Sequence, residues 1–269
     1  MLKKLIKVFL ERVAPKKFLF LMSWRSNRQA QRVMDRHGVP AISAAFIDRN
    51  GPRIVGGPFA GMDYVTRSAG SSFLPKLVGS YERELHPALE RILKTSYDTV
   101  IDVGCAEGYY AVGLALRLPG TPSVYAFDLD PGARRMCREL STRNGVLGRI
   151  TIGGFCDAGR LEELITQRSL VVSDCEGFEF ELLDPRRAPA LRRAEIVVEL
   201  HEALKPGTTA ALWERFETTH HIQLVDTEDR NPADYPVLGF LSERERAIAI
   251  SEFRSGPMQW AIMIPKAPR

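Results

Sequence analysis

With 269 residues, of which 45% are apolar and 26% charged, the chain has the composition of an ordinary globular protein. No stretch reaches the roughly 18 to 20 uncharged apolar residues that a membrane span needs, and the four cysteines form no CxxC pair and no His/Cys metal pattern. The net charge is +4, but residues 1–36 carry ten Lys or Arg and only two acids, so a basic arm precedes a mildly acidic body. We expect a reducing, cytoplasmic location and no secretion, because the cysteines lie in apolar or turn segments and charges interrupt any signal-peptide core.

The first predicted element is a short basic amphipathic helix. Its apolar residues recur at helical spacing: Leu2, Leu5, Ile6, Phe9, Leu10 and Val13. Such a helix could lie on the inner face of an anionic membrane, but packing on the body, or on a second subunit of a homo-oligomer, is the favoured interpretation. Residues 38–78 are rich in Gly, Ser and Pro and indicate loops with short strands. We therefore divide the chain into an N-terminal extension, residues 1–79, and a main domain, residues 80–269.

From residue 80 onward, helical and strand patterns alternate. Ser80 can cap a first helix whose apolar face includes Leu85 and Leu89. Predicted strands follow at 99–103, 123–127, 149–154, 170–173 and 195–199. Predicted helices lie at 108–118, 131–144, 158–168, 177–184 and 208–218, and a short one near 242–252 separates the late strands "IQLVDTE" and "MQWAIMIP". Apolar strands separated by helices indicate an α/β, Rossmann-like fold: a mostly parallel sheet with helices on both faces and an antiparallel C-terminal end.

The stretch "TVIDVGCAEGYYAVGLA", residues 99–115, joins the first strand to its helix through a glycine turn. Such a turn places backbone N–H groups and a helix N-terminus near a ligand at the carboxyl edge of the sheet. A dinucleotide site would read G-x-G-x-x-G, whereas here Ala106 stands between Gly104 and Gly108, and Asp102 precedes them. The carboxylate of Asp102 would repel a pyrophosphate and attract an ammonium group. Turn geometry alone, with Asp102 as a loop cap, is the structural alternative.

Three further positions extend this predicted ligand site. Asp128 ends the second strand, "VYAFDLD", where a carboxylate can accept hydrogen bonds from both hydroxyls of a ribose. Asp157, in "GGFCDAG", could accept from the exocyclic amine of adenine, with Phe155 or Cys156 beside the ring, or it could be an ordinary helix cap. Tyr109 is a candidate contact or a packing residue. An ammonium group, a ribose and an adenine in succession make up S-adenosylmethionine (SAM).

These motifs resemble those of the class I SAM-dependent methyltransferases and, more narrowly, of the FkbM-type family. The resemblance lies in "VIDVGCAEGYYAV", "VYAFDLDP", "SDCEGFEFELL" and "VVELHE", and it covers residues 97–203, with a lead-in at "KLVGSYERELHPAL". The family usually has Glu at the position of Asp128 and Asn near Ala106, although a shorter carboxylate still reaches a ribose. The resemblance implies the class I methyltransferase fold, SAM as cofactor, and O-methylation of a hydroxyl on a sugar, glycan or other small metabolite.

A hydroxyl acceptor needs a base or a metal ion, because it is almost fully protonated at neutral pH. Candidates follow the fourth and fifth strands: Asp174 and Glu176 in "SDCEG", and Glu199 and His201 in "ELHE". His201 is the favoured base because the ordinary pKa of histidine is near neutral, and a hydrogen-bonded loop histidine is the alternative. Asp174, Glu199 and His201 could also coordinate Mg²⁺ or another divalent cation.

The acceptor pocket is predicted to include Glu199 and, from "SEFRSGPMQW", Arg254 and Trp260. Arg254 could bind an anionic group or pair with Glu252. No nucleic-acid partner is expected, because the basic residues lack interleaved aromatic side chains and the body is acidic. An NAD-dependent oxidoreductase is disfavoured by the glycine spacing and by Asp102. A non-catalytic SAM-fold binding or assembly protein and a protein-directed methyltransferase stay open as alternatives.

Overall fold

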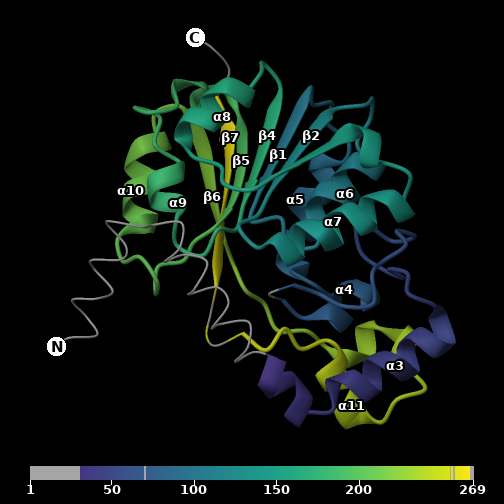
Figure 1. Cartoon of the computed structure of the whole chain (residues 1–269). Coiled ribbons are helices and arrows are strands. Elements are labelled where there is room, and N and C mark those ends of the chain that lie inside the picture. The colour runs from purple at the N-terminus through teal and green to yellow at the C-terminus, as the bar shows by residue number, and fades with distance from the viewer. Residues whose placement is uncertain (1–30, 70, 255, 257, 267–269) are drawn as a thin grey trace, which may run out of the picture.

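The computed structural model describes residues 31–269 except 70, 255, 257 and 267–269, so the predicted N-terminal amphipathic helix lies outside the described residues. Its centre is a seven-stranded sheet in the order β3-β2-β1-β4-β5-β7-β6 (Figure 1). The strands are β1 Thr99–Val103, β2 Ser123–Phe127, β3 Ile150–Gly153, β4 Ser169–Ser173, β5 Glu195–Glu199, β6 His220–Asp226 and β7 Gln259–Pro265. The first five strands pair in parallel, and β7 pairs antiparallel with both β5 and β6. The predicted α/β, Rossmann-like fold, a mostly parallel sheet with an antiparallel C-terminal end, is confirmed.

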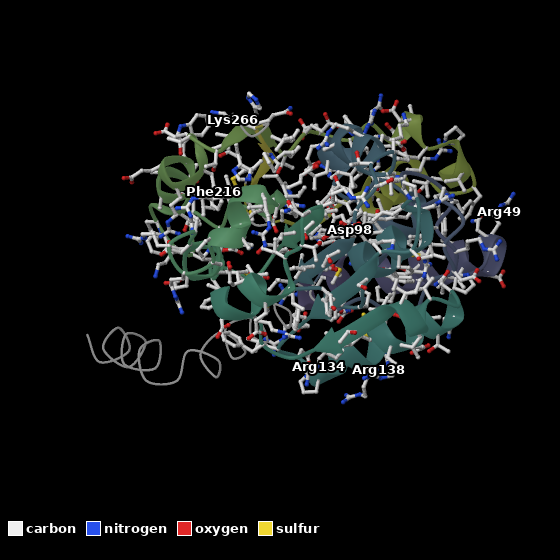
Figure 2. The ribbon with its side chains drawn as sticks, turned by 90° about the horizontal axis from the view of Figure 1, so that it is seen from above. Arg49, Asp98, Arg134, Arg138, Phe216 and Lys266 are labelled. Carbon is white, nitrogen blue, oxygen red and sulfur yellow. The ribbon has the colours of Figure 1, made fainter. Side chains whose placement is uncertain are left out.

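Helices cover both faces of this sheet (Figure 1). They are α5 His86–Ile92, α6 Tyr109–Arg117, α7 Pro131–Arg143, α8 Ala158–Leu164, α9 Glu179–Leu182 and α10 Thr208–Phe216. A further helix, α11 Glu243–Ala249, packs against the segment before the sheet instead (Figure 1). Alternate side chains of one strand enter opposite cores: Val100 packs with α5, α6 and α7, whereas Ile101 packs with α8, α9 and α10. The outer side of α7 is polar and carries the exposed Arg138, labelled in Figure 2. Arg134 of the same helix donates to the carbonyls of Asp128 and Leu129 just after β2. The sheet is therefore packed by a separate hydrophobic core on each face.

The segment before the sheet differs from its prediction. Residues 38–78 contain two helices, α3 Val39–Asn50 and α4 Phe73–Val78, where loops and short strands were expected. The apolar face of α3, which includes Ile42 and Phe46, packs in the same core as the sheet, and Figure 1 shows α3 beside α11. The Gly and Pro content of residues 38–78 favoured a loop prediction. The glycines of this segment lie outside the two helices, so they do not interrupt either one.

Two predicted element bounds are also wrong. Ser80 does not cap a helix: its hydroxyl lies against the carbonyl of Pro75, and α5 begins only at His86, with Pro87 in its first turn. The helix predicted at 177–184 is the single turn α9. It is followed by a short 3₁₀ helix, Pro189–Arg193, that leads into β5.

Gly113 of α6 allows Phe59, from the segment before the sheet, to pack closely against this helix. A Cβ atom at Gly113, in the middle of α6, would lie 2.6 Å from the ring of Phe59. We expect Gly113→Ala to lower the free energy of unfolding by about 1–2 kcal/mol, because overpacking a core outweighs the better helix propensity of alanine. Urea denaturation measures this change. In the matched control Gly148→Ala, the new Cβ meets nothing within 4 Å, and stability should stay within about 0.5 kcal/mol. Equal stability of the two variants would contradict this packing.

Candidate functional site

A cavity opens at the carboxyl ends of β1 to β4, where the sequence predicts the ligand site. Five of the seven predicted cofactor residues line it: Asp102, Gly104, Ala106, Tyr109 and Asp128. Two predicted catalytic residues, Asp174 and Glu176, line the same cavity. The other predicted residues do not line it: Gly108, Asp157, Glu199, His201, Arg254 and Trp260.

Steric contacts and backbone angles explain why glycine stands at two positions of this turn. Gly104 has a φ of 89°, and a Cβ atom there would lie 1.6 Å from the carbonyl oxygen of Asp174. Gly108 has a φ of 96° at the start of α6, and its Cβ would lie 2.8 Å from the sulfur of Cys137. Ala106 is also left-handed, with a φ of 48°, and its N–H donates to Asp128 at 2.9 Å. Gly108 therefore shapes the turn without lining the cavity.

Burial changes the acidity of the two acids at this turn. Asp102 is 2% exposed, faces the cavity and accepts a hydrogen bond from the N–H of Ala111 in α6 at 3.0 Å. Burial raises the pKa of Asp102 to about 8 and the pKa of Asp128 to about 6. Asp102 thus caps α6. Its raised pKa keeps the carboxyl largely protonated at neutral pH, and a bound cation would displace this proton and favour the carboxylate.

The adenine side departs from the prediction at one residue. Asp157 accepts from the N–H of Arg160 at 3.0 Å and caps α8, and it does not reach the cavity. Its role as an adenine contact is therefore corrected to that of a helix cap. Phe155 and Cys156 do line the cavity, and the ring of Phe155 packs at 5.4 Å against that of Phe178.

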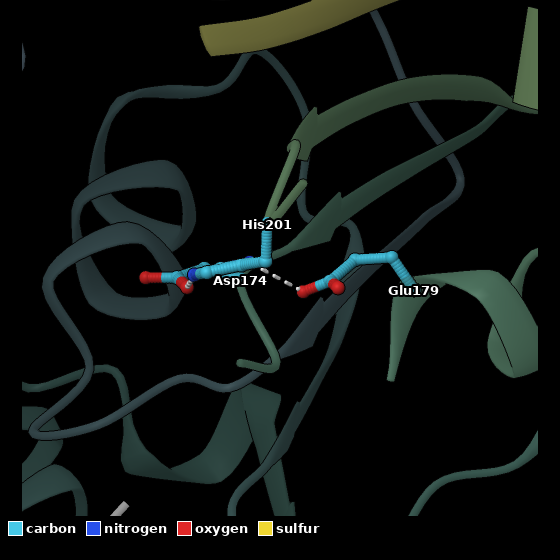
Figure 3. A group of neighbouring side chains, drawn as sticks. All are labelled: Asp174, Glu179 and His201. Atoms are coloured by element: carbon cyan, nitrogen blue, oxygen red, sulfur yellow. Dashed lines mark hydrogen bonds and ion pairs between the residues drawn. The ribbon is translucent and has the colours of Figure 1, made fainter. Parts of the chain in front are cut away.

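A cluster of acids surrounds His201 behind the cavity wall. The Nδ1 atom of His201 lies 2.9 Å from Glu179, and Figure 3 shows the imidazole between Glu179 and Asp174. On the other side of the ring, Nε2 lies 3.5 Å from Asp174, 3.6 Å from Glu199 and 3.8 Å from Glu176. His201 is 6% exposed.

These charges overturn the expectation that His201 is a free base. Burial disfavours the imidazolium, but the hydrogen bond to Glu179 and the surrounding negative charges outweigh it and raise the pKa of His201 to about 10. A protonated imidazole has no lone pair to accept a proton. Burial and the charge of Asp174 instead raise the pKa of Glu176 to about 7, which suits a general base at neutral pH. Glu176 also has a left-handed φ of 56°, a conformation that non-glycine residues rarely adopt.

The predicted acceptor residues Arg254 and Trp260 do not reach the cavity. Arg254 donates to Glu252 at 2.7 Å, to Glu199 at 2.8 Å and to Glu82 at 3.2 Å, so carboxylates already occupy its guanidinium. Trp260 is fully buried, and its ring lies edge-on to that of Tyr110 at 6.5 Å. Arg254 is therefore a structural ion-pair partner rather than an anion-binding residue of the cavity.

Sequence reasoning missed a buried ion pair beside the cavity. Lys76 of α4 lines the cavity, and its Nζ lies 2.5 Å from Glu107. The two side chains are 2% and 0% exposed. Glu107 stands within the glycine turn itself, which was the available signal, but residues 38–78 were expected to form loops and short strands.

The comparisons with known proteins give a partial match. No family model matches this sequence. The chain is similar to the ribosomal protein L11 methyltransferase of Aliivibrio salmonicida (strain LFI1238), with 29% identity over 137 residues, 51% of this chain and 37% of that protein. It thus matches little more than a third of that relative's length.

Two solved structures show weaker likeness. The O-methyltransferase TomG of Streptomyces achromogenes, in complex with SAM, is 12% identical, with a TM-score of 0.44 over 67% of this chain and 78% of that one. A putative rRNA-methylase of Clostridium thermocellum is 17% identical, with a TM-score of 0.46 over 68% and 97%. Similarities this low say nothing about the substrate of this chain. Among the described residues, no helix has the length and apolar character to cross a membrane.

Asp128 provides a test of the ligand site. If its carboxylate binds the ribose, Asp128→Ala weakens binding of S-adenosylhomocysteine (SAH) by about 1–3 kcal/mol, the value of hydrogen bonds to a charged group. Isothermal titration calorimetry measures this loss. Asp157→Ala is the matched control, because it removes a neighbouring acid that only caps a helix, and its SAH affinity should equal that of the wild type. Unchanged affinity in Asp128→Ala would remove Asp128 from the site.

Proposed function

We propose that this protein is a SAM-dependent methyltransferase. The observation that carries the proposal is the meeting of a buried acid, a glycine turn and a second acid in one cavity: Asp102, Gly104 and Asp128. Asp102 faces the ammonium group and Asp128 the ribose, while Phe155 and Cys156 flank the adenine. A dinucleotide is a poorer occupant, because the turn lacks the G-x-G-x-x-G spacing and a pyrophosphate brings no positive charge to displace the proton of Asp102. The similarity to a curated methyltransferase supports the same conclusion.

The proposed reaction is O-methylation of a hydroxyl on a sugar, glycan or other small metabolite, as the FkbM-type resemblance implies. SAM supplies the electrophilic methyl group when bound. Glu176, on the cavity wall with Asp174, accepts the proton of the acceptor hydroxyl as the oxygen attacks. His201 acts as a positioning residue: its imidazolium partly neutralises these two carboxylates from behind, and Glu179 fixes its ring.

Two other functions follow from specific features. The curated relative is by name a ribosomal protein methyltransferase, so a protein acceptor is the second candidate. A non-catalytic SAM-binding protein is the third, and it would leave Glu176, whose pKa of about 7 suits a general base, without a proton to accept. The three functions differ in where a methyl label ends up.

Methyl-labelled SAM separates these functions. Incubated with cell extract, the wild-type protein should transfer label to a small-molecule or glycan fraction. Its kcat/KM should increase as pH rises through about 7, because Glu176 must lose its proton to act as base. Glu176→Gln should bind SAH like the wild type and turn over about 10²–10⁴ times more slowly. Label in a protein fraction would favour the second function, and no label in any fraction the third. Full activity in Glu176→Gln would rule it out as the base.

A divalent cation is the second way to activate a hydroxyl at this site, and we propose a test of it. Asp174, Glu179 and His201 each offer a ligand atom within 4.8 Å of the others, and Glu199 adds an oxygen 3.6 Å from Nε2 of His201. These spacings fit a cation such as Mg²⁺ held by Asp174, Glu199 and His201, with Glu179 orienting the imidazole. The cation would have to displace the proton of His201, because only a neutral imidazole ligates a metal ion. If the cation is required, dialysis against EDTA should abolish methyl transfer, and added Mg²⁺ or Mn²⁺ should restore it. Full activity after chelation would leave proton transfer to Glu176 as the mechanism.

A further inference from the structure

The buried ion pair beside the glycine turn has no part in the function proposed so far. We propose that Ser71, backed by Lys76, binds the carboxylate of the amino-acid part of the cofactor. This inference rests on the proposed function, because it requires SAM or SAH as the ligand. It assigns a subsite for a carboxylate at the end of the cavity formed by α4 and the segment before it.

The first support is the charge of the cavity wall. Among the described residues that line the cavity, Lys76 is the only Lys, Arg or His, whereas five aspartates or glutamates lie at or just after the strand ends: Asp102, Asp128, Asp130, Asp174 and Glu176. Arg254 is not available, since three carboxylates occupy it. Glu107 balances the charge of Lys76, so the end of the cavity that holds this pair is the part of the wall least repulsive to a ligand carboxylate.

The second support is the cost of burying Lys76. Taking two charges out of water carries a desolvation penalty that their mutual attraction often fails to outweigh, so a buried pair is a weak source of stability. Glu107 nevertheless receives a full set of donors besides Lys76: the hydroxyl of Tyr64 at 2.7 Å, the N–H of Ala69 at 2.9 Å and the hydroxyl of Ser68. This arrangement fixes the ammonium group at the cavity wall, beneath the rings of Tyr81 and Tyr109, whose centres lie 4.8 and 5.5 Å from Nζ.

The third support is the hydrogen-bond direction at Ser71. The ammonium group of Lys76 donates to the hydroxyl of Ser71 at 2.7 Å and to that of Ser68 at 3.1 Å. The hydroxyl of Ser68 donates a hydrogen bond to Glu107. Within the described part of the chain, the hydroxyl of Ser71 accepts from Lys76 and no acceptor is seen for its own hydrogen. Since Ser71 lines the cavity and Ser68 does not, the hydroxyl of Ser71 is the polarised donor that faces a ligand.

The fourth support is the relation to Asp102. Burial is the main effect on the pKa of Asp102, but the charge of Lys76 opposes it, so the two side chains are within electrostatic reach of one another. An amino acid presents an ammonium group and a carboxylate on one carbon atom. Asp102 on one side and Ser71 with Lys76 on the other offer the matching pair of charges in one cavity.

The test compares two ligands that differ in the amino-acid part. SAH carries it, whereas 5′-methylthioadenosine keeps the adenosine and the thioether but lacks the ammonium and carboxylate groups. We expect Ser71→Ala to weaken SAH binding about tenfold and to leave 5′-methylthioadenosine within twofold, both measured by calorimetry. Ser68→Ala is the matched control: it contacts the same ion pair but not the cavity, and both affinities should stay within twofold.

A second variant tests the ammonium group without leaving a buried charge unpaired. The double variant Lys76→Met with Glu107→Gln should keep a cooperative thermal transition and lose at least tenfold in SAH affinity, again with 5′-methylthioadenosine unaffected. Equal loss for both ligands, or equal effects of Ser71→Ala and Ser68→Ala, would overturn the carboxylate subsite and leave the proposed function intact. If the wild type binds neither ligand, the proposed function itself fails.

Discussion

The close approach of β1 and β4 at their carboxyl ends is the constraint on which the site depends. The carbonyl oxygen of Asp174 occupies the space that a side chain at Gly104 would need, and the N–H of Asp174 donates to the carbonyl of Val103 at 2.9 Å. Because the two strands meet so tightly, the glycine turn after β1 and the acids after β4 face one cavity. Gly104 is thus required by the sheet as much as by any ligand.

Burial then gives this cavity an unusual acid–base character. It raises the pKa values of Asp102, Asp128 and Glu176 to about 8, 6 and 7, so these acids hold protons more tightly than free carboxyls do. A ligand that brings positive charge displaces those protons and gains the attraction of the resulting carboxylates. SAM carries both an ammonium group and a sulfonium, whereas an anionic acceptor would gain nothing at the Asp174 and Glu176 side.

The sequence predicts the sheet well because its information there is local. Runs such as "TVIDV" and "EIVVE" are buried on both faces, and the observed bounds of the first five strands agree with prediction to within one residue. The turn residues Asp102 and Asp128 also face the cavity as predicted, since strand order and strand ends place them there. The role of Asp157 was harder to predict, because an acid at this position of the sequence can either cap the following helix or bind the adenine ring.

What the sequence could not provide depends on residues far apart in the chain. The usual pKa of histidine made His201 a natural base, yet Glu179, 22 positions earlier, and Asp174 hold its proton. Lys76 was overlooked because its partner Glu107 is 31 positions away. Only the fold brings such pairs together. Burial and neighbouring charge, rather than residue type, therefore decide which side chains of this site can move a proton.

The charges around the acceptor side alternate in layers, and this order explains how so many acids share one site. Asp174 and Glu176 face the cavity, His201 lies behind them, and Glu179 lies behind the imidazole. Beside it, Arg254 separates Glu199 from other carboxylates in the same way. Each cation lowers the repulsion between the acids that it separates, but none reaches the cavity. Glu176, at the front of this arrangement, has a pKa of about 7, where a carboxyl group can take up a proton and release it again within one reaction cycle.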